Sequence, residues 1–323
     1  DNKLLRKQLM VTVGDDKRIM VYDVATRTLL AQSNPENHPD FIYAVSIIPK
    51  GNKIATACNH EVIRVFEIIK NPDYRKIKGS LPYKIQLFTR LTGHKDAVRS
   101  IRFSANGLRM VSASSDNTAI VWNTNNWEVE YVLKGHKKRV YKAEFSPDGR
   151  YVLTAGRDKT VIIWNLGLKN PDVFPIRHER RVSSLDISQN GERIYSATWG
   201  NENTPKRTLI TWDSMYQPVR IDSFDNDIEA VKSLDENSVL VAIGKELILK
   251  NINNQSKRIL GRAEATIKAV ALATNNDFIA YAGRDDKLYL TGLKRGNTVS
   301  SKMRNKVNGI TVLGDTIKKD KNE

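Results

Sequence analysis

Short runs in which apolar and polar residues alternate recur along the chain, separated by turn-forming Gly, Asn, Asp and Pro residues. Alternation over about four to eight residues is typical of a half-buried β-strand. One group of four such runs comprises Tyr43–Ile48, Lys53–Cys58, Val62–Phe66 and Leu87–Leu91. The pattern therefore predicts an all-β protein whose short strands come in groups of four.

The same pattern continues towards both ends of the chain. Two further groups are Ile228–Ser233, Ser238–Ile243, Leu247–Asn251 and Ser256–Leu260, then Ile267–Leu272, Phe278–Ala282, Lys287–Thr291 and Asn297–Ser301. The N-terminal segment supplies only three strands, Gln8–Val13, Ile19–Asp23 and Thr28–Gln32. Since Val307–Val312 has the spacing of a first strand, we expect the two ends to share one sheet and close a ring without free edges.

A repeat of fixed length occupies the middle of the chain. His94, His136 and His178 are each 42 residues apart, and Trp122 and Trp164 each follow their histidine by 28 residues. Serines and glycines recur at the same interval, namely Ser104, Ser146 and Ser188 with Gly107, Gly149 and Gly191. A period of ~40–45 residues with Gly-His near its start and Trp-Asp near its end indicates four-stranded propeller blades.

At these positions the chain resembles the WD-repeat family. The motif pairs are Gly93-His94 with Trp122-Asn123, Gly135-His136 with Trp164-Asn165, and Arg177-His178 with Trp212-Asp213. Trp212 lies 34 residues after His178, because Gly200–Pro205 lengthens one turn. The resemblance is strong over residues 92–213 and weaker on either side. It implies a seven-bladed β-propeller of four-stranded antiparallel blades, closed by N- and C-terminal strands that share one blade.

The resemblance also implies a buried hydrogen-bonded network in each blade, made by a His, a Ser or Thr, an Asp and a Trp. Two sets are complete, His94, Ser112, Asp116 and Trp122, then His136, Thr154, Asp158 and Trp164. A third set, His178, Ser196 and Trp212, lacks the Asp, and the set of His38 has Thr56, His60 and Phe66. We expect these histidines to be structural. Metal binding and acid–base catalysis are the alternatives.

Length and composition favour one domain. We expect a propeller over residues 1–313, an inserted loop over 67–86 in blade two, and a basic tail over 314–323. The one cysteine, Cys58, allows no disulfide framework, which favours an intracellular location in cytoplasm or nucleus. No apolar run approaches the ~18 residues of a membrane span. Because strand pattern begins almost at Asp1, we expect a module of a larger chain.

The chain carries 52 Lys and Arg against 36 Asp and Glu, a formal net charge of +16. This excess favours acidic partners, such as an acidic or phosphorylated protein surface or RNA. The alternative is that the cations only solvate loops. The resemblance implies three partner-contacting positions per blade, which include Phe41, Tyr43, Arg99, Arg139, Tyr141, Arg157, Arg181, Lys268 and Arg284. Only blade six, with Asp227 and Glu229, is acidic there and should repel such a partner.

The insertion in blade two is a second basic feature, on the opposite face. Its cations are Lys70, Arg75, Lys76, Lys78 and Lys84, interleaved with Pro72, Tyr74, Pro82 and Tyr83. Cations that alternate with aromatic rings suit single-stranded RNA, because rings stack on bases while charges follow phosphates. A loop that contacts nothing is the alternative interpretation.

The motifs of common enzymes are absent from the sequence. It contains no phosphate-binding loop, Cys-x-x-Cys pair, Gly-x-Ser-x-Gly elbow or His-Glu-x-x-His. We therefore predict a non-catalytic scaffold or recognition module for an acidic protein partner, with no cofactor, no metal and no membrane contact. The alternatives are an RNA-binding component of a ribonucleoprotein assembly and an enzyme with a site in the central channel.

Overall fold

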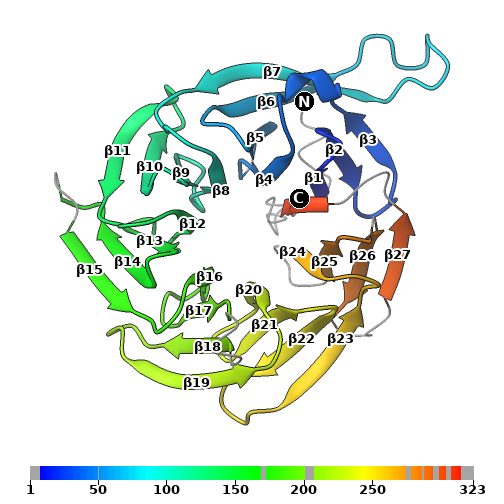
Figure 1. The fold of residues 1–323 in the computed structure, drawn as a ribbon. Helices are drawn as coiled ribbons and strands as arrows, with labels where there is room; N and C mark the ends of the chain where they lie inside the picture. The colour runs from blue at the N-terminus through cyan, green and yellow to red at the C-terminus, as the bar shows by residue number, and fades with distance from the viewer. Residues whose placement is uncertain are drawn as a thin grey trace, which may run out of the picture.

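Seven four-stranded antiparallel sheets stand around a central channel in the computed structural model (Figure 1). The structure describes residues 8–49, 51–168, 172–200, 207–273, 278–285, 287–293, 298–302 and 307–313. The predicted seven-bladed propeller is therefore confirmed. Within these residues, no helix has the length and apolar character that crossing a membrane requires.

Each sheet is one blade, and its strands follow one another outward from the channel. Blade one holds β28 (Val307–Leu313), β1 (Leu9–Gly14), β2 (Ile19–Asp23) and β3 (Leu29–Gln32), followed by the short 3-10 helix η1 (Pro35–Asn37). Blade two holds β4 (Ile42–Ile47), β5 (Lys53–Cys58), β6 (Ile63–Lys70) and β7 (Tyr83–Leu91). Blade three holds β8 (Val98–Phe103), β9 (Arg109–Ser114), β10 (Thr118–Asn123) and β11 (Glu128–Lys134).

The remaining blades repeat this order. Blade four holds β12 (Val140–Phe145), β13 (Tyr151–Gly156), β14 (Thr160–Asn165) and β15 (Asp172–Arg177). Blade five holds β16 (Val182–Ile187), β17 (Ile194–Thr198), β18 (Arg207–Trp212) and β19 (Pro218–Phe224). Blade six holds β20 (Ile228–Ser233), β21 (Ser238–Ile243), β22 (Glu246–Asn251) and β23 (Lys257–Arg262). Blade seven holds β24 (Ile267–Leu272), β25 (Phe278–Gly283), β26 (Lys287–Gly292) and β27 (Thr298–Lys302).

The ring closes through blade one, as predicted. Strand β28 pairs antiparallel with β1, with Leu313 opposite Leu9 and Thr311 opposite Val11. The C-terminal strand thus completes a sheet begun at the N-terminus, and both strands are protected from pairing with other chains. The predicted tail, residues 314–323, lies outside the described residues.

The core lies between neighbouring blades, because each sheet packs its apolar face against the next. Ala55 and Val65 of blade two, for example, join Ile101, Met110 and Trp122 of blade three in one buried cluster. Such contacts bind each blade only to its neighbours, so the stability of the ring depends on every interface being present.

The insertion in blade two differs from the predicted loop. Strands β6 and β7 extend into it and pair from Glu67 opposite Gln86 to Lys70 opposite Tyr83, so residues 71–82 alone form the connection. The physical reason is that alternation continues through the insertion, and Ile68 and Ile85 pack on the cluster shared by blades one and two. The expected loop over 67–86 is therefore a long β-hairpin.

Candidate partner-binding face

Blades three and four each contain a complete hydrogen-bonded network, which joins the loop before the first strand to the second strand and the turn that follows it. In blade three, Nε2 of His94 lies 2.7 Å from Oγ of Ser112, which also accepts a 2.9 Å bond from Nε1 of Trp122. Nδ1 of His94 lies 2.9 Å from Asp116. Burial opposes ionisation of Asp116, yet hydrogen bonds from His94 and Thr118 hold the pKa of its carboxyl well below the usual range.

Blade four repeats this geometry. Thr154 Oγ1 lies 2.8 Å from both His136 Nε2 and Trp164 Nε1, and Nδ1 of His136 lies 2.9 Å from Oδ2 of Asp158. The backbone N–H of Lys137 donates to the same carboxylate at 2.7 Å. Because Asp158 lies in the turn between the second and third strands, the network ties this turn to the loop that enters the blade.

The networks of blades two and five lack the carboxylate. His178 lies 2.8 Å and Trp212 2.7 Å from Ser196 Oγ, while His38 lies 2.8 Å from Thr56 Oγ1. Burial lowers the pKa of His178 to about 4, and burial together with Arg64 lowers the pKa of His38 to about 3. Both rings are therefore neutral at pH 7.

These two neutral histidines predict acid destabilisation. Below about pH 6.5 the unfolded chain binds a proton at each histidine that the folded chain does not bind, so stability is complete above this pH and falls as pH falls towards 4. The expected loss between pH 7 and pH 5 is about 2 kcal/mol per histidine. Urea unfolding at both values should give a smaller loss for His178→Gln than for the parent. An equal loss would contradict the buried neutral state.

The loops that enter the first strands and the turns between second and third strands lie on one face. In four blades a backbone N–H of the turn donates to a carbonyl of the loop. The pairs are Ser115 with Ala97, Arg157 with Arg139, Trp199 with Arg181, and Arg284 with Thr266, at 2.8 to 3.2 Å. We call this surface the arginine face. Its members are Phe41, Tyr43, Arg99, Arg139, Tyr141, Arg157, Arg181, Lys268 and Arg284.

Members of the arginine face differ in exposure. Arg139, Arg181, Arg284 and Phe41 are exposed, whereas Tyr43, Arg99, Tyr141, Arg157 and Lys268 are half-buried. Among the described residues, no side chain pairs with Arg139, Arg181 or Arg284. These three guanidinium groups are therefore available to an incoming acidic group.

Two cations of the face are already engaged. Arg99 donates from Nε to Ser115 Oγ at 2.9 Å and lies 5.1 Å from the centre of the Tyr43 ring. Lys268 forms a 2.5 Å ion pair with Glu229. Such contacts brace neighbouring blades and reduce what these cations can offer a partner.

The two carboxylates of the predicted repulsive sector in blade six are also engaged. Glu229 is paired with Lys268, and Asp227 accepts a 2.8 Å bond from Nε of Arg207. Each carboxylate is thus matched by a cation from another blade, which leaves this sector close to neutral.

Sequence reasoning missed one residue of the face, Trp199. Its ring packs edge to face on Tyr141, with centroids 5.3 Å apart, and joins blades four and five. The spacing from the network residue would have found it, because Ser115, Arg157 and Trp199 each follow their Ser or Thr by three residues. The missing Asp in blade five hid this equivalence.

The structure also places chemistry-bearing side chains in the channel. Glu144 and Asp186 lie there, but Lys232 contacts both, at 3.3 and 2.5 Å. Within the described part of the chain, no three His, Cys, Asp or Glu side chains come together as a metal site. The channel thus presents ion-paired carboxylates, which are poorly placed for proton transfer.

Comparison with known proteins agrees with the repeat spacing. The family model described as "WD domain, G-beta repeat" matches residues 85–123 and 127–165. U3 small nucleolar RNA-associated protein 13 of Saccharomyces cerevisiae is 36% identical over 77 residues, which are 24% of this chain and 9% of that protein. Protein HIR1 of Gibberella zeae is 24% identical over 133 residues, 37% of this chain and 12% of that protein. The chain therefore spans only a small part of the length of both relatives.

Proposed function

We propose that this chain, which belongs to the WD-repeat family, is a non-catalytic scaffold that binds an acidic protein partner on its arginine face. WD-repeat propellers typically act as interaction platforms, and neither relative's printed name states an enzymatic activity. The single observation that carries the proposal is the pairing of Arg139, which is exposed, with Arg157, which is half-buried, through a 2.8 Å hydrogen bond between their backbones.

The chemistry of the face supports an acidic ligand. A planar guanidinium pairs a carboxylate or phosphate through two parallel hydrogen bonds. Beside the arginines, Phe41 is 43% exposed, and the Tyr141–Trp199 pair adds aromatic surface between blades. Arginine and aromatic side chains carry most of the binding energy at protein interfaces. The face therefore combines charge for attraction with rings for burial.

Reversing the charge of two arginines should abolish partner binding. In Arg139→Glu/Arg157→Glu, attraction becomes repulsion, and we expect at least about hundredfold weaker binding. Affinity capture from a cell extract, quantified by mass spectrometry, should recover a partner with the parent chain that the variant loses. The matched control, Arg150→Glu/Lys257→Glu, makes the same charge change at exposed residues outside the face and should retain the partner.

The same experiment can overturn the proposal. If the double variant unfolds at the parent temperature and still captures every partner, the arginine face is not the working surface. Salt adds a second readout, because binding of an acidic partner should weaken as ionic strength rises.

RNA binding is the second candidate function, and the hairpin of blade two favours it. In the connection between β6 and β7, Tyr74 is 41% and Ile77 60% exposed, and Arg75 lies 5.5 Å from the Tyr74 ring. Lys76 and Lys78 beside them are also exposed. One relative is associated with a small nucleolar RNA by its name. Ribonuclease treatment before capture separates the two functions, because capture through RNA would then be lost irrespective of Arg139 and Arg157.

A further inference from the structure

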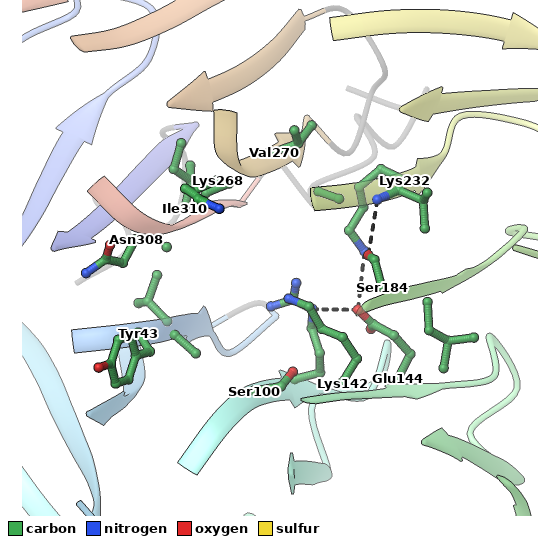
Figure 2. A pocket seen from close by; sticks show the side chains of 18 residues that line it. Tyr43, Ser100, Lys142, Glu144, Ser184, Lys232, Lys268, Val270, Asn308 and Ile310 are labelled. Atoms are coloured by element: carbon green, nitrogen blue, oxygen red, sulfur yellow. Dashed lines mark hydrogen bonds and ion pairs between the residues drawn. The ribbon is translucent and has the colours of Figure 1, made fainter. Parts of the chain in front are cut away.

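The first strands of the seven blades form rings of equivalent residues around the central channel. The third residue of each strand lines one cavity in the channel, and this ring comprises Ala44, Ser100, Lys142, Ser184, Ala230, Ala269 and Gly309. Six of the seven are Gly, Ala or Ser. Lys142 is therefore the only long side chain of this ring of residues, and it lines the cavity (Figure 2).

A charged network lies two residues further along the same strands. Arg102 donates from Nε to Oε1 of Glu144 at 2.8 Å, and Lys232 lies 3.3 Å from the same oxygen (Figure 2). Lys232 also pairs with Asp186 at 2.5 Å, and the second oxygen of Asp186 accepts the N–H of Ser233 at 2.6 Å. Both carboxylates are thus occupied by Arg102 and Lys232.

Lys142 takes no part in these ion pairs. Among the described residues no hydrogen bond or ion pair holds its ammonium group. Three cations, Arg102, Lys142 and Lys232, face two carboxylates, so one positive charge is unmatched. Desolvation, together with the positive charge of Arg102, lowers the pKa of Lys142 to about 8. A half-buried charge without a counter-ion is costly, which means that an anion near Lys142 would stabilise the folded chain.

A neighbouring polar group lacks a partner as well. Ser100 occupies the same ring in the adjacent blade, is only 1% exposed, and its hydroxyl has no hydrogen-bond partner. The cavity that both residues line has a volume of about 50 Å³. One water needs roughly 10–15 Å³ by this measure, so the space accepts a small polyatomic ion and excludes a nucleotide.

We propose that the central channel is a binding site for a small oxyanion of the size of phosphate, held between the Lys142 ammonium and the Ser100 hydroxyl. The excess positive charge selects against a metal cation, and the polar lining selects against an apolar ligand. Tyr43 and Lys268 of the arginine face also line this cavity, but Lys142 and Ser100 do not belong to that face, and Arg139 and Arg157 do not line the cavity. Failure of the site and failure of the proposed function are therefore separable.

Calorimetric titration with inorganic phosphate in a low-chloride buffer tests the site. The parent chain should bind one phosphate and should unfold at a higher temperature in its presence. Lys142→Met removes the charge but keeps the length of the side chain, and it should weaken binding about tenfold to a hundredfold. The matched control, Lys257→Met, removes an exposed lysine of an outer strand and should bind like the parent.

Folding of the variant can be checked independently. Lys142→Met loses an isolated, half-buried charge, so without phosphate it should unfold at or above the parent temperature. A measurement on the unaltered protein avoids the variant altogether: with ¹³C at lysine Cε, the resonance that titrates with a pKa of about 8 should shift to a higher pKa when phosphate is added. Absence of phosphate binding to the parent, or equal binding by Lys142→Met, would overturn the proposal.

Discussion

Replacing Trp164 by alanine should lower the free energy of unfolding by ~3–5 kcal/mol, the usual cost of removing a large buried aromatic side chain. Trp164 is 2% exposed, and its Nε1–H donates to Thr154 Oγ1 at 2.8 Å. Its ring belongs to the cluster that joins blades three and four. The variant therefore loses apolar burial, a hydrogen bond and part of an interface between blades.

The packing around Trp164 leaves little room for collapse into the cavity. A Cβ on Gly135 would lie 2.9 Å from Cη2 of this ring, which explains why glycine precedes His136 in the repeat. The backbone of the loop before β12 thus packs directly on the indole ring of Trp164. Removing the ring deprives the loop of its support, and a rigid loop cannot fill the space.

Urea unfolding followed by circular dichroism measures this loss without depending on tryptophan fluorescence. Trp127→Ala is the matched control, because Trp127 is a half-buried tryptophan that packs on Phe88 and Phe103 at the rim. We expect less than half the loss for the control. A Trp164→Ala chain within about 1 kcal/mol of the parent would refute the assigned network, since cavities of this size cost more.

Much of this fold was predictable because each blade repeats a local pattern. Outside β6 and β7, the strands predicted by alternation agree with the observed strands within two residues at either end. In blades six and seven, which lack the His and Trp, alternation alone was enough to predict the strands. The alternation of apolar and polar residues indicates which face of a strand is buried. Burial of that face in turn determines how the strand lies in the sheet.

The ion pairs of the site could not be predicted in this way. Glu229 and Lys268 are 39 residues apart and belong to different blades, and their contact depends on side-chain directions at a blade interface. The sequence did not single out Lys142 either, because its lack of an ion-pair partner is apparent only when all seven first strands are arranged as a ring. Contacts between blades follow from closure of the ring, which no single repeat encodes.

Blade seven illustrates a substitution within the network. Tyr289 donates to Asp285 at 2.8 Å, and Asp285 also accepts the N–H groups of Glu264 and Ala265 in the entering loop. The phenol therefore does here what a histidine does in blades three and four. Tyr and His both place a hydrogen-bond donor on an aromatic ring, but they are different residues, so a search for repeated residue identities misses the equivalence.

Deleting residues 307–323 should open the ring and cause the largest loss of stability among these changes. The deletion removes β28, whose Val307 and Ile310 are 3% and 5% exposed, and uncovers Met10 of β1 in the same cluster. Burial of each large apolar side chain contributes roughly 1.5–3 kcal/mol, so the loss is about 5 kcal/mol or more. This approaches the whole stability of many domains, which is about 5–15 kcal/mol.

Opening the ring should also change the oligomeric state. Without β28, strand β1 presents unpaired N–H and C=O groups along its edge, which can pair with a second chain. We expect the truncated chain to associate or aggregate in light scattering after size-exclusion chromatography, and a synthetic peptide of residues 307–313 to restore part of its stability by adding the missing strand. Deletion of residues 314–323 alone keeps all of β28 and should behave like the parent. A chain lacking residues 307–323 that stayed monomeric, with the parent's unfolding midpoint, would show that β28 does not hold the ring closed.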